Sequence, residues 1–472
     1  MQALRDSGAG PGTRSQTRNM KPVIQPLQHG CDLVELHRLD PASYPGLLQS
    51  TAHGRYDILF AFPCDSLVLN AAGTLQGPDN GPGAPGDFLQ RLDQWWRENQ
   101  AAGPDDSGLP FTGGWFLYLG YELAAQIETR LRLPAGSAVL PVAMATRFRS
   151  AVIRDHRQKA SWIVAEPGQQ ELAGRIKADV AALSRQGSGP AAENPVIAVT
   201  EAEPFLYTQA VARILDYIRE GDVFQVNLSR QWDIDFSQPV DPVSIYRQLC
   251  IHNPAPFSGL LDLGDATIIS SSPERLVAVR AGQVETRPIA GTRPRSLTGS
   301  VDRAYSTELL AHPKERAEHI MLIDLERNDL GRICVPGSIA VNELMALESY
   351  AHVHHIVSNI RGSLRADVTP GQVMRAVFPG GTITGCPKVR CMEIIAELEH
   401  AARGAYTGSM GYLNRDGSMD LNILIRTMVS HAGRISLRAG AGIVADSVPE
   451  AELAETRAKA RGLLRALGLD SP

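Results

Sequence analysis

Residues 434–459 read RISLRAGAGIVADSVPEAELAETRAK, and this stretch carries three structural signals in succession. The first part predicts a strand, which leads into a glycine-rich segment. Ser447 and Glu450 have the spacing of a capping box, and Pro449 suits the first turn of a helix. We therefore expect a strand, a glycine loop and a helix that begins near Ser447.

The expected helix presents two carboxylates on one face. Glu452 and Glu455 are three residues apart, and Lys459 follows four residues after Glu455. A second amphipathic helix, in K-E-R-A-E-H-I-M-L-I-D-L, repeats the pattern with Glu315 and Glu318. One interpretation is that both are solvated helix surfaces. The other is a Mg²⁺ site, since this ion is held by one or two carboxylates together with anionic substrate groups. Spacing alone leaves both open.

The glycines of this stretch also allow more than one interpretation. Gly440, Gly442 and Ala445 form G-x-G-x-x-A, a dinucleotide fingerprint, but the expected helix begins too late to offer its N-terminus to a pyrophosphate. A loop that closely approaches another anion fits better, with a tight turn without a ligand as the alternative. A second glycine-rich segment, F-P-G-G-T-I-T-G-C-P-K at 378–388, is not a P-loop, because Cys386 follows its last glycine.

The composition favours a small-molecule substrate. The 472 residues include 46 Lys and Arg against 51 Asp and Glu, a net charge of −5, without a block of like charges. Neither nucleic acid nor a membrane surface is therefore expected as a partner. The six cysteines lack metal-site or disulfide spacing, and there is no secretory or membrane-spanning apolar segment. We expect reduced cysteines and a cytoplasmic protein.

The chain divides at a polar segment, S-R-Q-G-S-G-P-A-A-E-N-P. We predict a disordered tail at 1–21, an N-terminal region at 22–183, a linker at 184–203 and a catalytic domain at 204–465. Strands and helices do not alternate strictly in the catalytic domain. The pattern therefore favours an α+β fold over a doubly wound sheet.

Two ionisable residues gain meaning only from their surroundings. Glu274 follows the strand-like T-I-I-S-S-S, and His355 lies in A-H-V-H-H-I-V-S; in isolation, such residues usually face solvent or the core. Their segments belong to an ordered set that resembles the chorismate-utilising enzymes. The set comprises QVNLSR (225–230), SSPER (271–275), RPIAGTRPR (287–295), AEHIMLIDLERND (317–329), GGTITGCPKVR (380–390) and GAGIVADS (440–447).

The resemblance implies a fold and a site. The implied fold is α+β, with two antiparallel β-sheets packed as a sandwich, helices on the outside and the active site between the sheets. Mg²⁺ would be bound by Glu318 and Glu455, with Glu315 and Glu452 beside them. Glu274 would be the acid near the C4 hydroxyl of chorismate, and His355 would border the ring. The residues implied to bind the substrate are Gly291, Thr292, Thr382, Tyr412, Arg426, Gly440, Ala441, Gly442 and Lys459.

The same resemblance indicates the ammonia-using branch of the family. Gln225 replaces the lysine that isochorismate and salicylate synthases use as a base for water, and an amide cannot deprotonate water. Asn227, the run A-P-F-S at 255–258 and G-G-T-I-T-G at 380–385 resemble the aminodeoxychorismate synthase type, which aminates chorismate at C4 for p-aminobenzoate and folate synthesis. Ala290 departs from that type, whose P-I-K-G-T lysine is thought to attack C2. Anthranilate synthase, which aminates at C2, is therefore the alternative.

The chain lacks the G-x-C-x-G element of a glutaminase. A separate glutamine amidotransferase subunit is therefore implied as the source of ammonia. In G-L-L-Q-S at 46–50, Gln49 replaces the glutamate of the tryptophan-binding element of anthranilate synthases, so tryptophan feedback is not expected. Two hypotheses from other classes remain: a dinucleotide-binding oxidoreductase and a binding subunit without turnover.

Overall fold

The computed structural model describes residues 21–27, 31–52, 54–78, 80–101, 103, 106–136, 139–186, 195–295, 298–349 and 353–469. The helices are α2 (Leu33–Leu39), α3 (Phe88–Glu98), η2 (Tyr121–Leu123), α4 (Ala124–Ile127), α5 (Gln170–Gln186), α6 (Pro204–Arg219), α7 (Pro242–His252), α8 (Gly299–Ala311), α9 (Pro313–Gly331), α10 (Pro370–Val377), η3 (Gly381–Ile383), α11 (Lys388–Glu399) and α12 (Pro449–Ala466).

The strands are β1 (Val23–Leu27), β2 (Gly46–Gln49), β3 (Tyr56–Leu69), β4 (Thr74–Gly77), β5 (Asn80–Pro85), β6 (Gly114–Leu119), β7 (Ala143–Asp155), β8 (Ala160–Ala165), β9 (Val196–Glu201), β10 (Gln225–Phe236), β11 (Phe257–Asp262), β12 (Ala266–Ser272), β13 (Arg275–Arg280), β14 (Gln283–Arg287), β15 (Ile289–Pro294), β16 (Ala340–Ser349), β17 (Val353–Ser363), β18 (Gly385–Cys386), β19 (Ser409–Asn414), β20 (Met419–Asn422), β21 (Thr427–His431) and β22 (Arg434–Ile443). Helix and antiparallel strand are thus mixed, as an α+β chain requires.

The strands form one hydrogen-bonded network with two arms. One edge of β7 pairs with β3 along its length, whereas the other edge pairs first with β6 and then with β8. From β3, one arm runs through β2, β11, β12, β21, β22 and β10 to β9. From β6, the other runs through β19, β20, β13 and β14 to β17. The two arms are joined through β3 and β7, so the strands belong to one hydrogen-bonded network.

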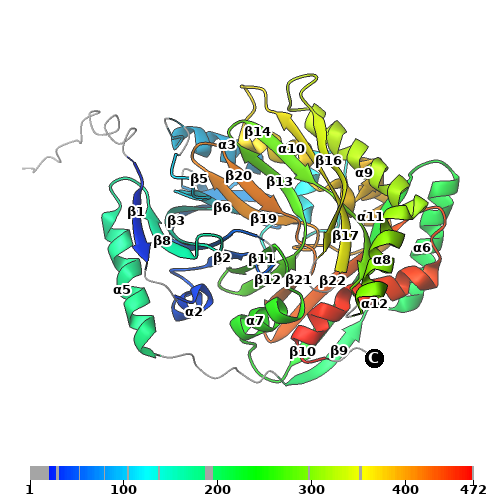
Figure 1. The fold of residues 1–472 in the computed structure, drawn as a ribbon, viewed down its shortest axis with the longest axis horizontal. Coiled ribbons are helices and arrows are strands. Elements are labelled where there is room, and N and C mark those ends of the chain that lie inside the picture. Colours follow the sequence, from blue (N-terminus) through cyan, green and yellow to red (C-terminus); the bar gives the residue numbers. More distant parts are fainter. Residues whose placement is uncertain are drawn as a thin grey trace, which may run out of the picture.

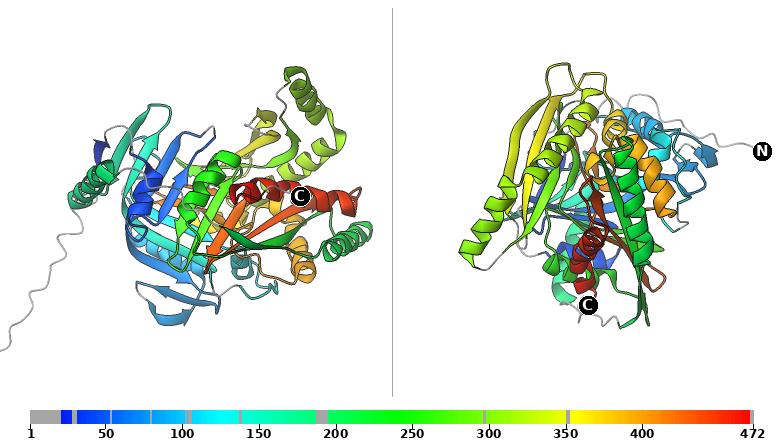
Figure 2. Two further views of the ribbon diagram at one scale, coloured as in Figure 1. Left: turned by 90° about the horizontal axis from the view of Figure 1, so that it is seen from below. Right: turned by 90° about the vertical axis from the view of Figure 1, so that its right-hand side faces the viewer.

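Apolar side chains fill the space between the two arms. Phe60 of β3, Phe116 of β6, Leu261 of β11 and Met410 of β19 belong to one buried cluster. A Cβ on Gly259 would lie 2.4 Å from the Met410 methyl group, which shows how closely the arms approach. Helices cover the outer faces: α5 packs on β8, and α11 and α12 pack on β10 and β22 (Figure 1). Helix α9 packs against β17 (Figure 2).

The predicted division into an N-terminal region and a catalytic domain does not separate the strands. Strand β2 pairs with β11, and β6 pairs with β19, so both arms combine strands from either side of the boundary. The predicted linker at 184–203 contains β9, which pairs with β10. Residues 187–194 and the predicted tail at 1–20 lie outside the described residues. The strong sequence signal of polar residues at 184–195 therefore marks a connection within the fold.

Two local predictions around the glycine segment need correction. The expected loop at 440–442 lies inside β22, which pairs on both edges, with β10 and β21. Helix α12 begins at Pro449 as expected, but Val448 occupies the N-cap position and no capping box forms. The Ser447 hydroxyl instead donates to the Glu452 carboxylate, with Oγ and Oε1 2.6 Å apart. A buried acceptor in the first turn thus competes with the cap.

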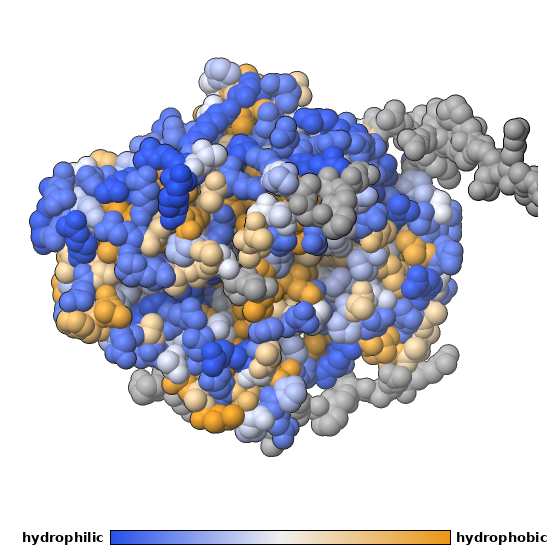
Figure 3. Space-filling view, turned by 180° about the vertical axis from the view of Figure 1, so that it is seen from behind, coloured by the Kyte–Doolittle hydropathy of each residue, from blue (hydrophilic) through white to orange (hydrophobic). Residues whose placement is uncertain are grey.

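The remaining predictions concern the redox state of the cysteines and the polarity of the protein surface. All six cysteines are free thiols, which confirms that none is in a disulfide. Within the described residues, no helix is both long and apolar enough to span a membrane. The face seen in Figure 3 is mainly hydrophilic, with apolar residues interspersed. Scattered apolar residues of this kind are normal on a globular surface.

Candidate active site

Glu274 and Thr382 form the centre of the candidate site. Glu274 lies between β12 and β13, is 4% exposed, and accepts a hydrogen bond from the Thr382 hydroxyl, with Oγ1 and Oε1 2.8 Å apart. Burial raises the pKa of Glu274 to about 7, although the Thr382 hydroxyl, the Ile289 N–H and the Lys459 charge each oppose this. The carboxyl group can therefore hold a proton near neutral pH and donate it to a leaving group.

Gln225 stands beside one of the predicted metal ligands. It is the first residue of β10, is 3% exposed, and its amide N–H donates to Glu318, with Nε2 and Oε1 2.7 Å apart. Gly442 leaves the room for this amide, because a Cβ there would lie 2.3 Å from Nε2. The amide oxygen of Gln225 is buried and has no hydrogen-bond partner among the described residues.

Asn227 places a second amide next to the first. It pairs with Gly442 in the antiparallel register of β10 and β22, and its Nδ2 lies 3.5 Å from the carbonyl oxygen of Thr382. The side-chain oxygen of Asn227 is also buried without a hydrogen-bond partner in the described part of the chain. Two amide oxygens thus present unused acceptor capacity between Thr382 and the glycines of β22, where a small N–H donor would be stabilised.

The glycines of β22 allow side chains to approach the strand. A Cβ on Gly440 would lie 2.6 Å from the Tyr406 hydroxyl, and Lys459 Nζ donates to the Gly440 carbonyl over 3.1 Å. Lys459 also pairs with Glu455, with Nζ and Oε1 2.7 Å apart. The glycines thus permit the close approach of protein side chains to a strand, where a loop was expected. The dinucleotide hypothesis is wrong, because that fingerprint needs its glycines in a turn from a strand into a helix, whereas Gly440 and Gly442 are paired residues of strand β22 and α12 begins only at Pro449.

Arg426 and His355 form a second pair of site residues, in which Arg426 is a cation and His355 is neutral. Arg426 donates to the side-chain oxygen of Asn253 over 2.8 Å, and no ion pair to it is recorded in the described residues. Burial lowers the pKa of Arg426. Burial and the nearby Arg426 charge lower the pKa of His355 to about 4, so its imidazole is neutral at pH 7. A half-buried arginine whose side-chain partner is neutral is suited to a substrate carboxylate.

Gly291 and Thr292 lie on the strand that faces His355. Thr292 of β15 pairs with His355 of β17 in the antiparallel register, and a bulge sits between Ala290 and Thr292. Gly291 has a φ of +69°, and its carbonyl oxygen lies 3.4 Å from the His355 Nδ1 atom. A side chain at 291 would also meet the Glu315 carboxylate, 2.8 Å from the Cβ position. The predicted glycine thus satisfies both a backbone and a packing requirement.

The four predicted magnesium ligands have different surroundings. Glu318 is half-buried beside Gln225, and Glu455 is exposed beside Lys459. Glu315 pairs with Arg293 over 3.1 Å, and Glu452 is buried and accepts the Ser447 hydrogen bond. No group of three or more metal-binding side chains is assembled among the described residues. Glu318 and Glu455 fit Mg²⁺ as hard carboxylate donors, because this ion takes only one or two carboxylates beside substrate anions and water.

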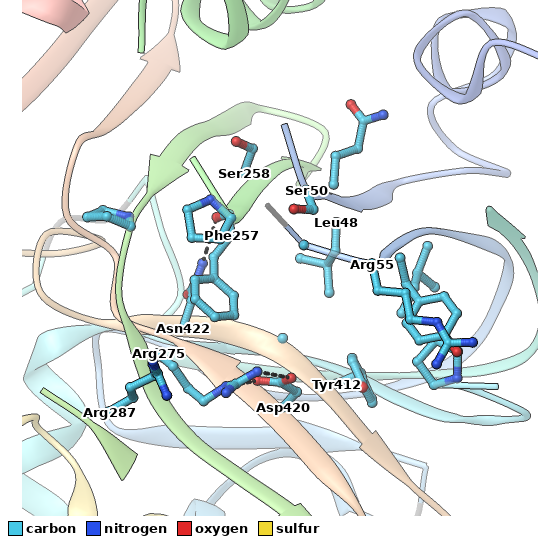
Figure 4. A pocket seen from close by; sticks show the side chains of 18 of the residues that line it. Leu48, Ser50, Arg55, Phe257, Ser258, Arg275, Arg287, Tyr412, Asp420 and Asn422 are labelled. Carbon is cyan, nitrogen blue, oxygen red and sulfur yellow. Dashed lines mark hydrogen bonds and ion pairs between the residues drawn. The ribbon is translucent and has the colours of Figure 1, made fainter. Parts of the chain in front are cut away.

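Tyr412 does not join the predicted substrate-binding residues. It lines a separate cavity of about 710 Å³ with Phe257, Arg275 and Arg287 (Figure 4). In that cavity, Arg275 forms a two-pronged ion pair with Asp420, at 2.8 and 3.0 Å. The strand β2 that contains Gln49 lines the same cavity.

Tyr406, rather than the predicted Tyr412, lies beside the substrate-binding residue Gly440 that sequence analysis proposed. Both tyrosines lie in G-A-Y-T-G-S-M-G-Y, six residues apart. Tyr412 is in the regular strand β19, whereas Tyr406 precedes it in a turn whose Thr407 has a φ of +59°. The neighbouring glycines that mark this turn are the sequence signal that could have identified Tyr406.

The comparisons with known proteins agree with this geometry. The family model described as chorismate binding enzyme matches residues 50–465. The chain therefore belongs to the family of chorismate binding enzymes, as its motifs predicted.

Within this family the chain is similar to members of two types. It is 40% identical over 436 residues to aminodeoxychorismate synthase component 1 of Bacillus subtilis, covering 90% of this chain and 91% of that protein. It is 42% identical over 368 residues to anthranilate synthase component 1 of Thermus thermophilus, covering 76% and 78%. The crystal structure of anthranilate synthase component I from Streptococcus pneumoniae shares the fold with a TM-score of 0.76 at 32% identity, covering 87% and 92%. Identity alone does not separate the two types.

Proposed function

We propose that this protein is an aminodeoxychorismate synthase component, which converts chorismate and ammonia to 4-amino-4-deoxychorismate for p-aminobenzoate and folate synthesis. The observation that carries the proposal is the pair of buried, unpartnered amide oxygens on Gln225 and Asn227. Ammonia is neutral and has three N–H donors, so such acceptors orient it without having to remove a proton first. Water would need a base, and an amide cannot serve as one.

The substrate is a dianion, and the site offers cations to hold it. Arg426 is half-buried with a neutral partner, so a substrate carboxylate would supply the counter-charge that this guanidinium lacks. Lys459 of helix α12 donates a hydrogen bond to the Gly440 carbonyl of β22. These groups fix the ring so that its C4 oxygen faces Glu274.

Glu274 supplies the proton for the departing hydroxyl. Hydroxide is a poor leaving group, and the pKa of about 7 lets a buried carboxyl carry the proton at neutral pH. Thr382 holds one oxygen of that carboxyl and so fixes its direction. His355 is neutral and buried, so it borders the ring without adding a charge.

Mg²⁺ is proposed as the cofactor, with Glu318 and Glu455 as its ligands. When bound, the ion would neutralise the ring carboxylate of chorismate. A separate glutamine amidotransferase subunit is proposed as the source of ammonia. Both proposals rest on the family resemblance. The Mg²⁺ proposal also rests on the half-buried Glu318 and the exposed Glu455 described above.

Anthranilate synthase is the second candidate, and one observation favours it. Position 290 carries a buried alanine, so no lysine is present there to form an adduct at C2. Direct attack of ammonia is then required for either product. Relatives of both types match at nearly equal identity.

Product analysis tests the proposal. The purified protein is incubated with chorismate, ammonium salt and Mg²⁺, with and without added 4-amino-4-deoxychorismate lyase. We expect p-aminobenzoate only when the lyase is present. Fluorescent anthranilate as the main product without the lyase would replace the proposal by the second candidate. Absence of any product with either ammonia or glutamine plus amidotransferase would favour a binding subunit without turnover.

A further inference from the structure

A buried arginine connects the two segments that carry the proposed ammonia site and the proposed acid. Arg403 follows α11 in the chain and is 4% exposed. Its guanidinium donates to the backbone carbonyl of Asn227 over 2.7 Å and to that of Ile383 over 3.2 Å. Asn227 carries one of the two amide oxygens that lack a partner among the described residues. Ile383 directly follows Thr382, whose hydroxyl donates to Glu274. One side chain thus bridges β10 and η3.

The guanidinium of Arg403 uses all five of its N–H donors. Besides the two carbonyls, it binds both carboxylate oxygens of Glu399, at 3.0 and 2.6 Å, and donates to the Thr407 hydroxyl over 3.2 Å. The side chains of Arg403 and Glu399 are only 1% and 2% exposed. A lysine has three N–H donors and a glutamine has two, so neither residue can reproduce these contacts.

Glu399 binds a second arginine, which does not reach η3. Arg438 of β22 donates to Glu399 over 2.8 Å. It also donates to two polar side chains of β10, those of Ser229 and Gln231. Among the described residues, no contact of Arg438 with η3 is recorded. The two arginines therefore share one carboxylate and a similar burial, and they differ in that Arg403 bridges two segments of the site.

We propose that Arg403 is a positioning residue: by binding a carbonyl on each side, it fixes η3 relative to β10, and so sets the proposed ammonia site and the direction of Glu274. A buried polar network whose members are all satisfied is rigid. A misplacement of reacting groups by about 1 Å can cost about 100-fold in rate. The link to catalysis rests on the proposed function, whereas the geometry of η3 is a property of the free protein.

Arg403→Gln and Arg438→Gln are a matched pair of variants for kinetics. Each leaves one arginine with Glu399, so neither variant buries an unpaired carboxylate. In assays with chorismate, ammonium salt and Mg²⁺, we expect Arg403→Gln to raise the KM for ammonia about tenfold and to lower kcat about tenfold, each the cost of roughly one hydrogen bond to a charged group. Arg438→Gln should leave both constants close to those of the wild type. Equal kinetic losses in the two variants, with an equally lowered Tm, would show a merely structural role and overturn the proposal.

A double-mutant cycle tests whether Arg403 acts through Thr382. Thr382→Val removes the hydroxyl that holds Glu274. If Arg403 sets the position of this hydroxyl, the double variant should lose less kcat than the product of the two single losses, because both changes disrupt the same contact. A loss equal to that product would contradict the proposal.

Crystal structures of the free wild type and of both variants test the geometry without turnover. In Arg403→Gln, we expect the distance between Thr382 Oγ1 and Glu274 Oε1 to exceed about 3.2 Å, outside the range of a hydrogen bond between two oxygens. Arg438→Gln should keep the contact of 2.8 Å. An unchanged distance in Arg403→Gln would overturn the proposal. If the wild type does not turn over chorismate, the proposed function fails, and these structures still decide whether Arg403 holds η3.

A second variant covers a failure of Arg403→Gln to fold. Arg403→Lys keeps the positive charge beside Glu399 but has too few donors to bind both carbonyls as well. It then takes the place of Arg403→Gln in the kinetic assays, the double-mutant cycle and the crystal structures, with the same expected and contradicting results.

Discussion

The hydroxyl of Thr382 donates to the carboxyl of Glu274 across 2.8 Å, although the two residues are 108 positions apart in the chain. Glu274 comes from the connection between β12 and β13, and Thr382 from the 3-10 turn η3. The contact fixes the direction of a carboxyl whose burial raises its pKa to about 7. Orientation and protonation of the acid thus have separate structural causes.

Glu274→Gln tests the acid. The amide keeps the size of the side chain and its acceptor oxygen for Thr382, but it cannot release a proton. We expect kcat with ammonia to fall at least about 100-fold, the usual contribution of a general acid, while chorismate affinity measured by calorimetry changes little. The control is Glu308→Gln, which removes an exposed carboxylate from α8. Unchanged kcat in Glu274→Gln would show that Glu274 is not the acid.

Buried Glu274 should also make stability depend on pH. Its folded pKa of about 7 exceeds the ordinary 4.5, so its burial costs nothing below pH 4.5, and stability is lost as pH rises toward 7. The full cost above pH 7 is about 3 kcal/mol at 1.36 kcal/mol per pKa unit. The free energy of unfolding of Glu274→Gln, measured with urea, should therefore equal that of the wild type near pH 4.5 and exceed it at pH 8. Equal stabilities at pH 8 would contradict this.

Gly442→Ala should disrupt the amide that faces the substrate. The added Cβ would lie 2.3 Å from Gln225 Nε2, so the amide must leave its hydrogen bond with Glu318. We expect the KM for ammonia to rise at least about tenfold, the cost of roughly one hydrogen bond to a charged group. Gly174→Ala is the matched control, because its Cβ would meet nothing within 4 Å. Equal kinetics in both variants would exclude a role for Gln225.

Arg426→Gln should weaken substrate binding. Loss of a charge-assisted hydrogen bond to a carboxylate costs about 1.5–3 kcal/mol, or about 10- to 150-fold in affinity. The control is Arg434→Gln. Arg434 is an exposed residue at the far end of β22 and pairs with Asp235 of β10. Calorimetric titration with chorismate measures both. Comparable affinities for the two variants would place the substrate carboxylates elsewhere.

Tyr406→Phe and Tyr412→Phe distinguish the two tyrosines. The Tyr406 hydroxyl lies against Gly440, whereas Tyr412 lines the cavity with Arg275. We expect Tyr406→Phe to raise the KM for chorismate about fivefold, the cost of one neutral hydrogen bond, and Tyr412→Phe to leave it unchanged. The opposite result in steady-state kinetics would restore the assignment made from sequence.

Sequence analysis predicted local elements and chemistry better than spatial arrangement. Helix α12 begins at Pro449, close to the expected start near Ser447, and the Glu315–Glu318 pair lies on α9, because apolar periodicity and proline position are local signals. The family that the motifs predicted was confirmed by the match to the family model. Tyr412 lines the cavity with Arg275 whereas Tyr406 lies against Gly440, and sequence analysis could not separate two tyrosines that differ only in the turn between them.

The strand pairings were not predictable from local signals. The glycines at 440 and 442 were expected in a loop, and only their register with β10 explains why a strand needs them. Likewise, the polar segment at 184–195 gives no indication that β9 follows it and pairs with β10.

The pairing of β6 with β19 has a consequence for biosynthesis. Strand β6 ends at Leu119, but its partner β19 comprises Ser409–Asn414, near the end of the chain. While the ribosome is still translating the middle of the message, β6 therefore has an open edge of unsatisfied backbone groups, which is prone to aggregation. The nascent polypeptide should depend on chaperones until β19 has been translated.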